Sequence, residues 1–145
     1  MDKGLAVFLM AVVGGLIALQ APINAGLGKA TGSFGAALVS FAIGTIALAA
    51  IVVLSGKAGG VAEAANVQWY YLLGGLLGAA YVFSALVLVD EIGAGGVAAA
   101  TVTGQLTASV LVDRLGVFGL EQTSLSATRL LGVALLLAGT FLIVR

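Results

Sequence analysis

The sequence predicts an all-α integral membrane protein with five transmembrane helices in a single domain, residues 1–145. Of the 145 residues, 61% are hydrophobic and only 8% are charged, whereas a soluble domain carries about 25% charged residues. The mean hydropathy is +1.23. A charge at the centre of a bilayer costs several kcal/mol, so the long uncharged intervals of this chain mark where helices can cross the membrane.

Four uncharged intervals are longer than the about 20 residues that one crossing requires. They lie between Lys3 and Lys29, Lys29 and Lys57, Glu63 and Asp90, and Glu91 and Asp113. The interval from Arg129 to Arg145 is shorter, so a fifth helix must begin near Ser126, a suitable N-cap, and the Arg129 side chain must extend toward the membrane surface. The expected helices are residues 4–27, 33–54, 68–89, 92–112 and 126–144.

The ends of these helices carry further signals. The first apolar run is too long for a signal peptide and lacks a small-residue cleavage site, so we expect it to be retained as a helix. The third helix opens on an aromatic anchor for the membrane interface, formed by Trp69, Tyr70 and Tyr71. The connection 113–125 is expected to lie in that interface because it holds four large apolar side chains. These are Leu115, Val117, Phe118 and Leu120.

The composition excludes several classes of function. The chain has no cysteine and no histidine, which removes disulfides, thiol nucleophiles, ordinary zinc sites and the commonest general base. We therefore expect no enzymatic activity and no cofactor. The formal net charge is +0 without a basic run, so no nucleic-acid partner is expected. Asp90 and Glu91 are interpreted as solvated charges in a tight turn, with a proton or cation site as the alternative.

An odd number of crossings determines how copies of the chain can pair. The basic residues divide four against two between the sides of the membrane, and this small bias leaves fixed and dual topology both open. Lys3, Lys57, Arg114 and Arg129 lie on the amino-terminal side, and Lys29 and Arg145 on the other. Because a solute path normally needs two structural halves, we expect an antiparallel, inverted dimer of ten helices. The partner is a second copy or an oppositely oriented homologue.

Stripes of small residues offer surfaces for close helix contact. Such stripes let helix backbones approach, which is how helices associate in lipid. They serve either the packing of one subunit or the contact between two subunits. Their members are Gly74 and Gly78 on the third helix and Gly96, Ala100, Gly104 and Ala108 on the fourth.

Two polar rows within the apolar helices predict a binding site for a small molecule. Gln20 and Asn24 share one face of the first helix, where Pro22 removes a backbone donor. A second row runs along the fourth helix at Thr101, Gln105 and Ser109. We hypothesise a cavity built from Gln105 of one copy and Gln20 and Asn24 of the other, faced by Tyr81 and Ser84. The alternative is ordinary capping and hydrogen bonding between helices.

Several stretches resemble one known family. The run from Leu19 to Gly28 (LQAPINAGLG), followed by residues 40–45 (SFAIGT), is similar to the YdcZ-like branch of the drug/metabolite transporter superfamily. Residues 73–82, 103–109, 129–132 and 138–139 extend the resemblance. It implies five-helix half-transporters that pair antiparallel and are related to the small multidrug resistance proteins. The chain departs from those proteins by lacking a glutamate in its first helix.

The leading interpretation is a transporter of the bacterial inner membrane that moves a small organic solute by alternating access. A non-transporting accessory or assembly subunit is the alternative, and it predicts a closed interface without a water-accessible polar cavity. A membrane enzyme acting on lipid would need a base or a metal cluster that the sequence does not offer.

Overall fold

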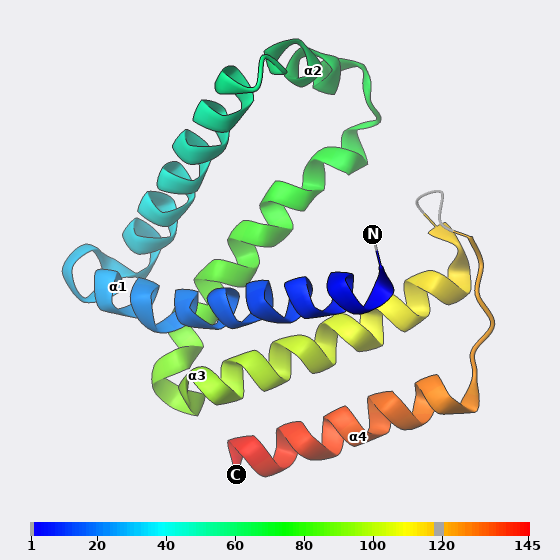
Figure 1. The fold of residues 1–145 in the computed structure, drawn as a ribbon. Helices are drawn as coiled ribbons and strands as arrows, with labels where there is room; N and C mark the ends of the chain where they lie inside the picture. Colours follow the sequence, from blue (N-terminus) through cyan, green and yellow to red (C-terminus); the bar gives the residue numbers. More distant parts are fainter. Residues whose placement is uncertain (1, 118–120) are drawn as a thin grey trace. The chain divides into compact units, whose positions relative to one another are not determined.

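The computed structural model describes residues 2–117 and 121–145, and every regular element in them is helical (Figure 1). The long elements are α1 (Lys3–Leu54), α3 (Leu73–Leu115) and α4 (Ala127–Val144). The chain divides into two compact units, Met1–Asp90 and Glu91–Arg145. We call them unit 1 and unit 2, and α3 passes from the first into the second.

Helix α1 is interrupted at Gly32. A straight helix of its 52 residues would extend about 78 Å, far beyond the about 30 Å hydrocarbon core of a bilayer. Gly32 instead has φ 72° and ψ 163°, a backbone conformation that is essentially restricted to glycine. The chain therefore turns back within unit 1 (Figure 1), inside the predicted connection between the first two helices.

Helix α3 carries the same kind of interruption at Gly93, with φ 71° and ψ 165°. This break lies two residues beyond the predicted turn at Asp90 and Glu91. The helix continues through Arg114 and Leu115, slightly past the predicted end at Val112. Together, Gly32 and Gly93 divide the two long helices near the positions where the sequence predicts connections.

The connection between α1 and α3 contains short helical turns, whereas the sequence predicts a loop over residues 55–67 and a third helix that starts at Gln68. They are α2 (Ala58–Ala62), the 3₁₀ helix η1 (Glu63–Asn66) and the 3₁₀ helix η2 (Trp69–Leu72). The Asn66 amide donates to the Glu63 carboxylate over 2.9 Å. Tyr70 and Tyr71 lie in contact, with ring centroids 4.6 Å apart. The predicted aromatic anchor thus occupies the 3₁₀ turn that leads into α3.

Helix α4 begins as the sequence predicts. Ser126 is its N-cap, and the Ser126 hydroxyl accepts a hydrogen bond from the Arg129 backbone N–H over 3.2 Å. Within unit 2, α4 runs beside the carboxyl-terminal part of α3 (Figure 1). Of the apolar residues predicted to place the preceding loop in the interface, Phe118 and Leu120 lie outside the described residues.

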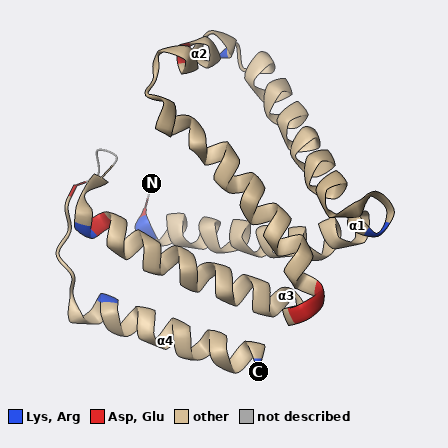
Figure 2. Cartoon of the chain, turned by 180° about the vertical axis from the view of Figure 1, so that it is seen from behind, with Lys and Arg blue, Asp and Glu red and all other residues tan. Residues whose placement is uncertain are grey.

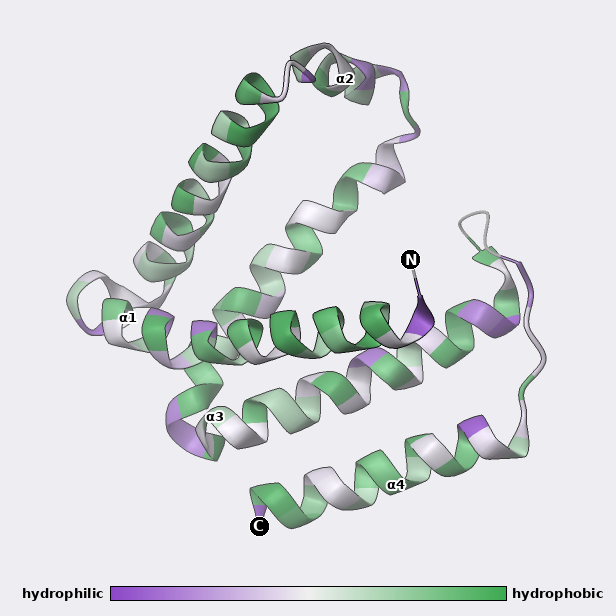
Figure 3. Cartoon of the chain, in the orientation of Figure 1, coloured by the Kyte–Doolittle hydropathy of each residue, from purple (hydrophilic) through white to green (hydrophobic). Residues whose placement is uncertain are grey.

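The helices have the surface of a membrane protein. Three helices of the described residues are long and apolar enough to cross a membrane: Lys3–Leu54, Trp69–Leu115 and Ala127–Val144. Hydrophobic residues, coloured green, dominate the helices, and hydrophilic ones, coloured purple, lie mainly at bends and ends (Figure 3). Charged residues gather at helix ends and bends (Figure 2). An all-helical membrane protein is therefore confirmed, while the count of five crossings remains a prediction.

Candidate functional site

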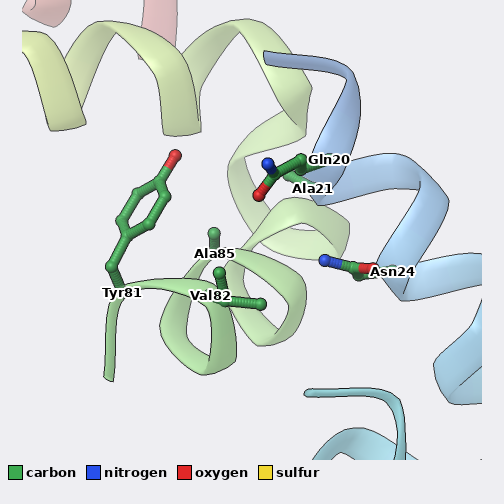
Figure 4. Close-up of a pocket in the computed structure, with 6 residues that line it drawn as sticks. All are labelled: Gln20, Ala21, Asn24, Tyr81, Val82 and Ala85. Atoms are coloured by element: carbon green, nitrogen blue, oxygen red, sulfur yellow. The ribbon is translucent and has the colours of Figure 1, made fainter. Parts of the chain in front are cut away.

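The two amides predicted on the first helix line a recess in unit 1. This recess, called the amide recess below, is formed by two turns of α1 and two turns of α3 (Figure 4). Its side chains close it so tightly that no volume remains for the centre of a water molecule. Its lining residues are Gln20, Ala21, Asn24, Tyr81, Val82 and Ala85.

The spacing of Gln20 and Asn24 explains how both amides reach the recess. Residues four apart lie on one face of a helix, and both side chains point from α1 toward the facing turns of α3 (Figure 4). Tyr81 enters from α3 with its hydroxyl toward the Gln20 side of the recess (Figure 4). The structure therefore brings together three of the four residues predicted for this part of the site.

Asn24 is the most buried polar residue of the chain's described part, with 5% exposure. No hydrogen bond joins its side chain to any residue within 2–117 or 121–145. No side-chain nitrogen or oxygen of the described residues is both fully sealed and unbonded, so the Asn24 amide keeps a small accessible area. A buried amide without a protein partner is uncommon and calls for an explanation.

Helix α1 stays regular through Pro22, because Gly32 holds the only non-helical backbone angles that its described residues show. The proline ring still removes the N–H that would bond the carbonyl of Ala18. The helix is therefore weakened beside the two amides but remains continuous there, and the break in α1 occurs ten residues later.

A second recess adjoins the first and shares Gln20 and Val82 with it. Its volume is about 220 Å³. Two hydroxyl residues of the second half of α1, Ser40 and Thr45, line it. Sequence reasoning did not select them as site residues. The signal was present, because both lie in the stretch SFAIGT that carried the family resemblance. Besides Gln20, Val82 and these two hydroxyl residues, Phe41, Gly44 and Leu48 line the recess.

Ser84, the fourth residue predicted for this part of the site, is exposed and does not line either recess. Its neighbour Ala85 does, and Phe83 stacks on Phe34 with ring centroids 4.4 Å apart. The one-residue step along α3 turns Ser84 away from the face that Tyr81 and Ala85 share.

In unit 2, the predicted polar row of the fourth helix lies partly along an open groove of about 520 Å³. Gln105 and Ser109 line it together with Asp113, all on one helix face at intervals of four residues. Thr101, one turn earlier, is half-buried and does not line the groove. Gln105 and Ser109 are exposed on the single chain.

Unit 2 also contains a buried hydroxyl pair that sequence reasoning did not single out. Thr103 of α3 is 6% exposed, and its hydroxyl lies 2.6 Å from that of Thr140 in α4. The Thr140 hydroxyl also donates to the carbonyl of Ala99 over 3.1 Å. Threonine is too common in membrane helices for the sequence to mark these two. They join the helices beside an apolar groove of about 370 Å³.

An ion pair links the carboxyl-terminal part of α3 to the start of α4. The Arg129 Nη1 lies 3.1 Å from the Asp113 Oδ2, and both side chains are partly exposed, at 41% and 38%. The Asp113 carbonyl also accepts from the Thr123 N–H over 2.8 Å. Arg129 thus neutralises the one carboxylate that borders the groove of Gln105.

The small-residue positions fall into two groups. A methyl group added at Gly78 would touch Phe41, and one at Gly96 would lie 3.3 Å from Val144, so these two glycines serve packing within a unit. Gly74 and Gly104 have open space around them, and Ala100 and Ala108 are exposed. The stripe of Ala100, Gly104 and Ala108 is therefore free on the single chain.

No group of three metal-ligating carboxylates, histidines or cysteines occurs within the described part of the chain. The site consists of amides and hydroxyls on apolar helices. Such an arrangement can hold a small molecule by hydrogen bonds and contact, without covalent chemistry.

Comparison with known proteins identifies the family. Residues 5–142 match the family described as "Putative inner membrane exporter, YdcZ". The chain belongs to this family. No curated protein and no solved structure matches the sequence. The family assignment confirms the predicted resemblance and the inner-membrane location, and its description names an exporter instead of an enzyme class.

Proposed function

We propose that this YdcZ-family chain is one half of an exporter that moves a small organic solute across the inner membrane by alternating access. The working unit is an antiparallel homodimer in which copies of opposite topology face one another. The single observation that carries the proposal is the family match, which covers nearly the whole chain. The amide recess and the exposed polar row then supply the groups that would bind the solute.

Five crossings per copy follow from treating the two glycine breaks as turns between membrane spans. Each part of α1 and α3 then has at least the about 20 residues needed for one crossing, and α4 has 18. The breaks at Gly32 and Gly93 lie beside charged residues, Lys29 in the first case and Asp90 and Glu91 in the second. Charges beside a break favour its placement at a membrane surface.

The binding cavity is proposed to form between copies. Gln105 of one copy would face Gln20 and Asn24 of the other, with Tyr81 beside them and with Ser84, Thr101 and Ser109 at the border. Two features of the single chain support this arrangement. The amide recess has no space of its own for a solute, and the Gln105 row lies on an open groove. A second copy would cover the groove and enclose the polar groups.

Topology tests the inverted dimer directly. Single cysteines placed at Ser55 and at Arg145 of the otherwise cysteine-free chain are labelled from each side of intact cells. Labelling of each site from both sides is expected for dual insertion. Labelling of each site from one side only would remove the inverted homodimer and require an oppositely oriented partner.

Gln105→Leu tests the shared cavity. The variant should lose binding of the small organic solute that a thermal-shift screen of the purified chain identifies, because the leucine offers no hydrogen bond. Dimer formation, followed by cross-linking, should persist. Gln68→Leu is the matched control, since Gln68 precedes η2 and lines neither recess. Unchanged binding in Gln105→Leu would remove this residue from the cavity.

One observation favours the alternative of an accessory subunit that does not transport. That alternative predicts a closed polar interface, and the amide recess indeed excludes water-sized molecules. The neighbouring recess of about 220 Å³, which shares Gln20, favours transport instead. Solute-dependent protection of a cysteine at Ser40 would support the exporter, whereas inaccessibility of that cysteine in every condition would support the accessory subunit.

A further inference from the structure

We propose that the amide recess, closed in the single chain, opens into the proposed cavity between copies and there binds an uncharged hydrogen-bonding group of the solute, such as a carboxamide, a urea or a hydroxyl, and that Asn24 is the residue that bonds this group. This inference rests on the export function proposed above and names the class of solute. It assigns the chain to neutral polar molecules and away from organic cations and anions.

The burial of Asn24 is the first observation that points to a ligand. Its side chain is directed into the recess (Figure 4), the residue is 5% exposed, and its amide has no hydrogen-bond partner in residues 2–117 and 121–145. A residue that is 5% exposed leaves its amide little contact with solvent, so a ligand that supplies a hydrogen bond to this amide returns free energy. An asparagine side chain presents both an acceptor and two donors, so its complement is a group that both accepts and donates.

The absence of charge around Asn24 is the second observation. The other polar groups of the amide recess and its neighbour are the Gln20 amide and the hydroxyls of Tyr81, Ser40 and Thr45. No Asp, Glu, Lys or Arg of the described residues lines either recess. A solute ammonium or carboxylate entering here would lose its hydration without gaining a counter-charge, which is strongly unfavourable in a low-dielectric site.

The charge that borders the Gln105 groove supports the same conclusion. Asp113 borders the Gln105 groove, but Arg129 already occupies its Oδ2 atom. A cationic solute would have to share this carboxylate, which Arg129 already neutralises, with a residue of the chain itself. The groove therefore offers its amide and hydroxyl, Gln105 and Ser109, as the accessible groups.

A set of three probes of matched shape and different charge tests the class. Benzamide, benzamidinium and benzoate share one ring and one planar end group and differ in charge. Each is added to the purified full-length chain in lipid nanodiscs, and thermal unfolding is followed by the fluorescence of Trp69, the single tryptophan. We expect benzamide to raise the Tm and the two ions to leave it unchanged.

Asn24→Asp links the preference to this residue. The substitution keeps the size of the side chain and replaces a neutral group by a carboxylate. Benzamidinium, in place of benzamide, should therefore raise the Tm of the Asn24→Asp variant. The ratio of their half-saturating concentrations should change by about tenfold or more, because the new charge has no other partner in the recess. Asn66→Asp is the matched control. It makes the same chemical change in the exposed turn η1 and should keep the wild-type preference.

Asn24→Leu gives a second measurement that needs no ligand. If the Asn24 amide is hydrogen-bonded only when a ligand is present, an apolar side chain of similar size should raise the Tm of the ligand-free protein by about 2–4 °C. A lower Tm would show that Asn24 holds helices together, and it would overturn the inference. Stabilisation of the wild type by either ion as strongly as by benzamide, or by none of the three probes, would overturn it as well.

These outcomes separate the solute class from the export function. Binding of benzamidinium to a wild type that inserts in both orientations would remove the neutral solute and leave the inverted exporter standing. Binding of benzamide to a chain that inserts in one orientation would keep the solute class and remove the inverted homodimer.

Discussion

The two units of the chain treat their polar side chains in opposite ways. In unit 2, Thr103 and Thr140 bond each other across two helices and Asp113 bonds Arg129. In unit 1, the amides of Gln20 and Asn24 are placed on one helix face and find no partner within the described residues. Both units consist of apolar helices suited to the same lipid bilayer. The difference in hydrogen bonding therefore does not come from the solvent around the helices.

The comparison separates polar groups that bond one helix to another from polar groups that have no protein partner and are proposed to bind a ligand. A hydrogen bond between membrane helices contributes about 0.6 kcal/mol on average, so the Thr103–Thr140 pair is explained by packing alone. A fully buried amide without a partner costs about 1–3 kcal/mol; Asn24 keeps a small accessible area, so its cost is lower, but packing does not explain its unbonded amide. Unit 2 is therefore interpreted as a scaffold at its buried positions, and the two amides of unit 1 as part of the proposed binding cavity.

The largest effects on folding should come from substitutions at the two glycine breaks, Gly32 in unit 1 and Gly93 in unit 2. Gly32→Val and Gly93→Val force a β-branched side chain into a conformation with φ near +70°, which costs more than about 1–3 kcal/mol. We expect each variant to lose most of its folded, monodisperse yield in size-exclusion chromatography. Gly14→Val, in a helix with open space around it, is the control. Normal yield of Gly32→Val would show that the break is not fixed by this backbone conformation.

A second prediction compares two glycines of one helix face in unit 2. Gly96→Leu should destabilise the chain by about 1–3 kcal/mol, because a single added methyl already lies 3.1 Å from Ile92 and 3.3 Å from Val144. Gly104→Leu should leave the thermal stability of the single chain unchanged, since nothing lies near it. If a second copy packs on the stripe of Ala100, Gly104 and Ala108, Gly104→Leu should weaken dimer cross-linking. Equal loss of stability in both variants would contradict this division.

The third prediction applies the comparison to hydrogen bonds. Thr103→Val should destabilise the chain by about 1 kcal/mol, opposite in sign to the effect expected for Asn24→Leu. Thr140→Val and the double variant complete a double-mutant cycle, measured by equilibrium unfolding in detergent. A coupling energy near zero would show that the 2.6 Å contact contributes nothing, and the two units would then no longer differ.

The architecture was largely readable from the sequence because charge is costly in lipid. The uncharged intervals predicted helices whose breaks occur at Gly32 and Gly93, inside or close to the expected connections. Ser126 was recognisable as an N-cap because capping depends on local geometry. The helical turns of residues 58–66 were missed, since short 3₁₀ and α segments leave no clear hydrophobic period. The start of the predicted third helix is the 3₁₀ turn Trp69–Leu72, and the α-helix begins at Leu73.

The site was only half readable for a related reason. Spacing of four residues placed Gln20 with Asn24 and Gln105 with Ser109, since helical geometry alone determines which residues share a face. Ser84 lies outside the recess because the rotation of one helix against another depends on packing that a single sequence does not encode. Ser40, Thr45 and the Thr103–Thr140 pair were missed because hydroxyl residues are common in membrane helices, and only contact distinguishes those that matter.

The smallest effect is expected at the ion pair between Asp113 and Arg129. Both side chains are about 40% exposed, so screening limits the pair to about 0–1 kcal/mol. Arg129→Gln should therefore change stability little in high salt and slightly more in low salt, measured by thermal unfolding across ionic strengths. The same variant frees the Asp113 carboxylate beside Gln105 and Ser109. Benzamidinium should then stabilise Arg129→Gln although it leaves the wild type unchanged, because the carboxylate no longer has a partner of its own. If it stabilises neither protein, the groove of unit 2 does not admit solutes, and binding belongs to unit 1 alone.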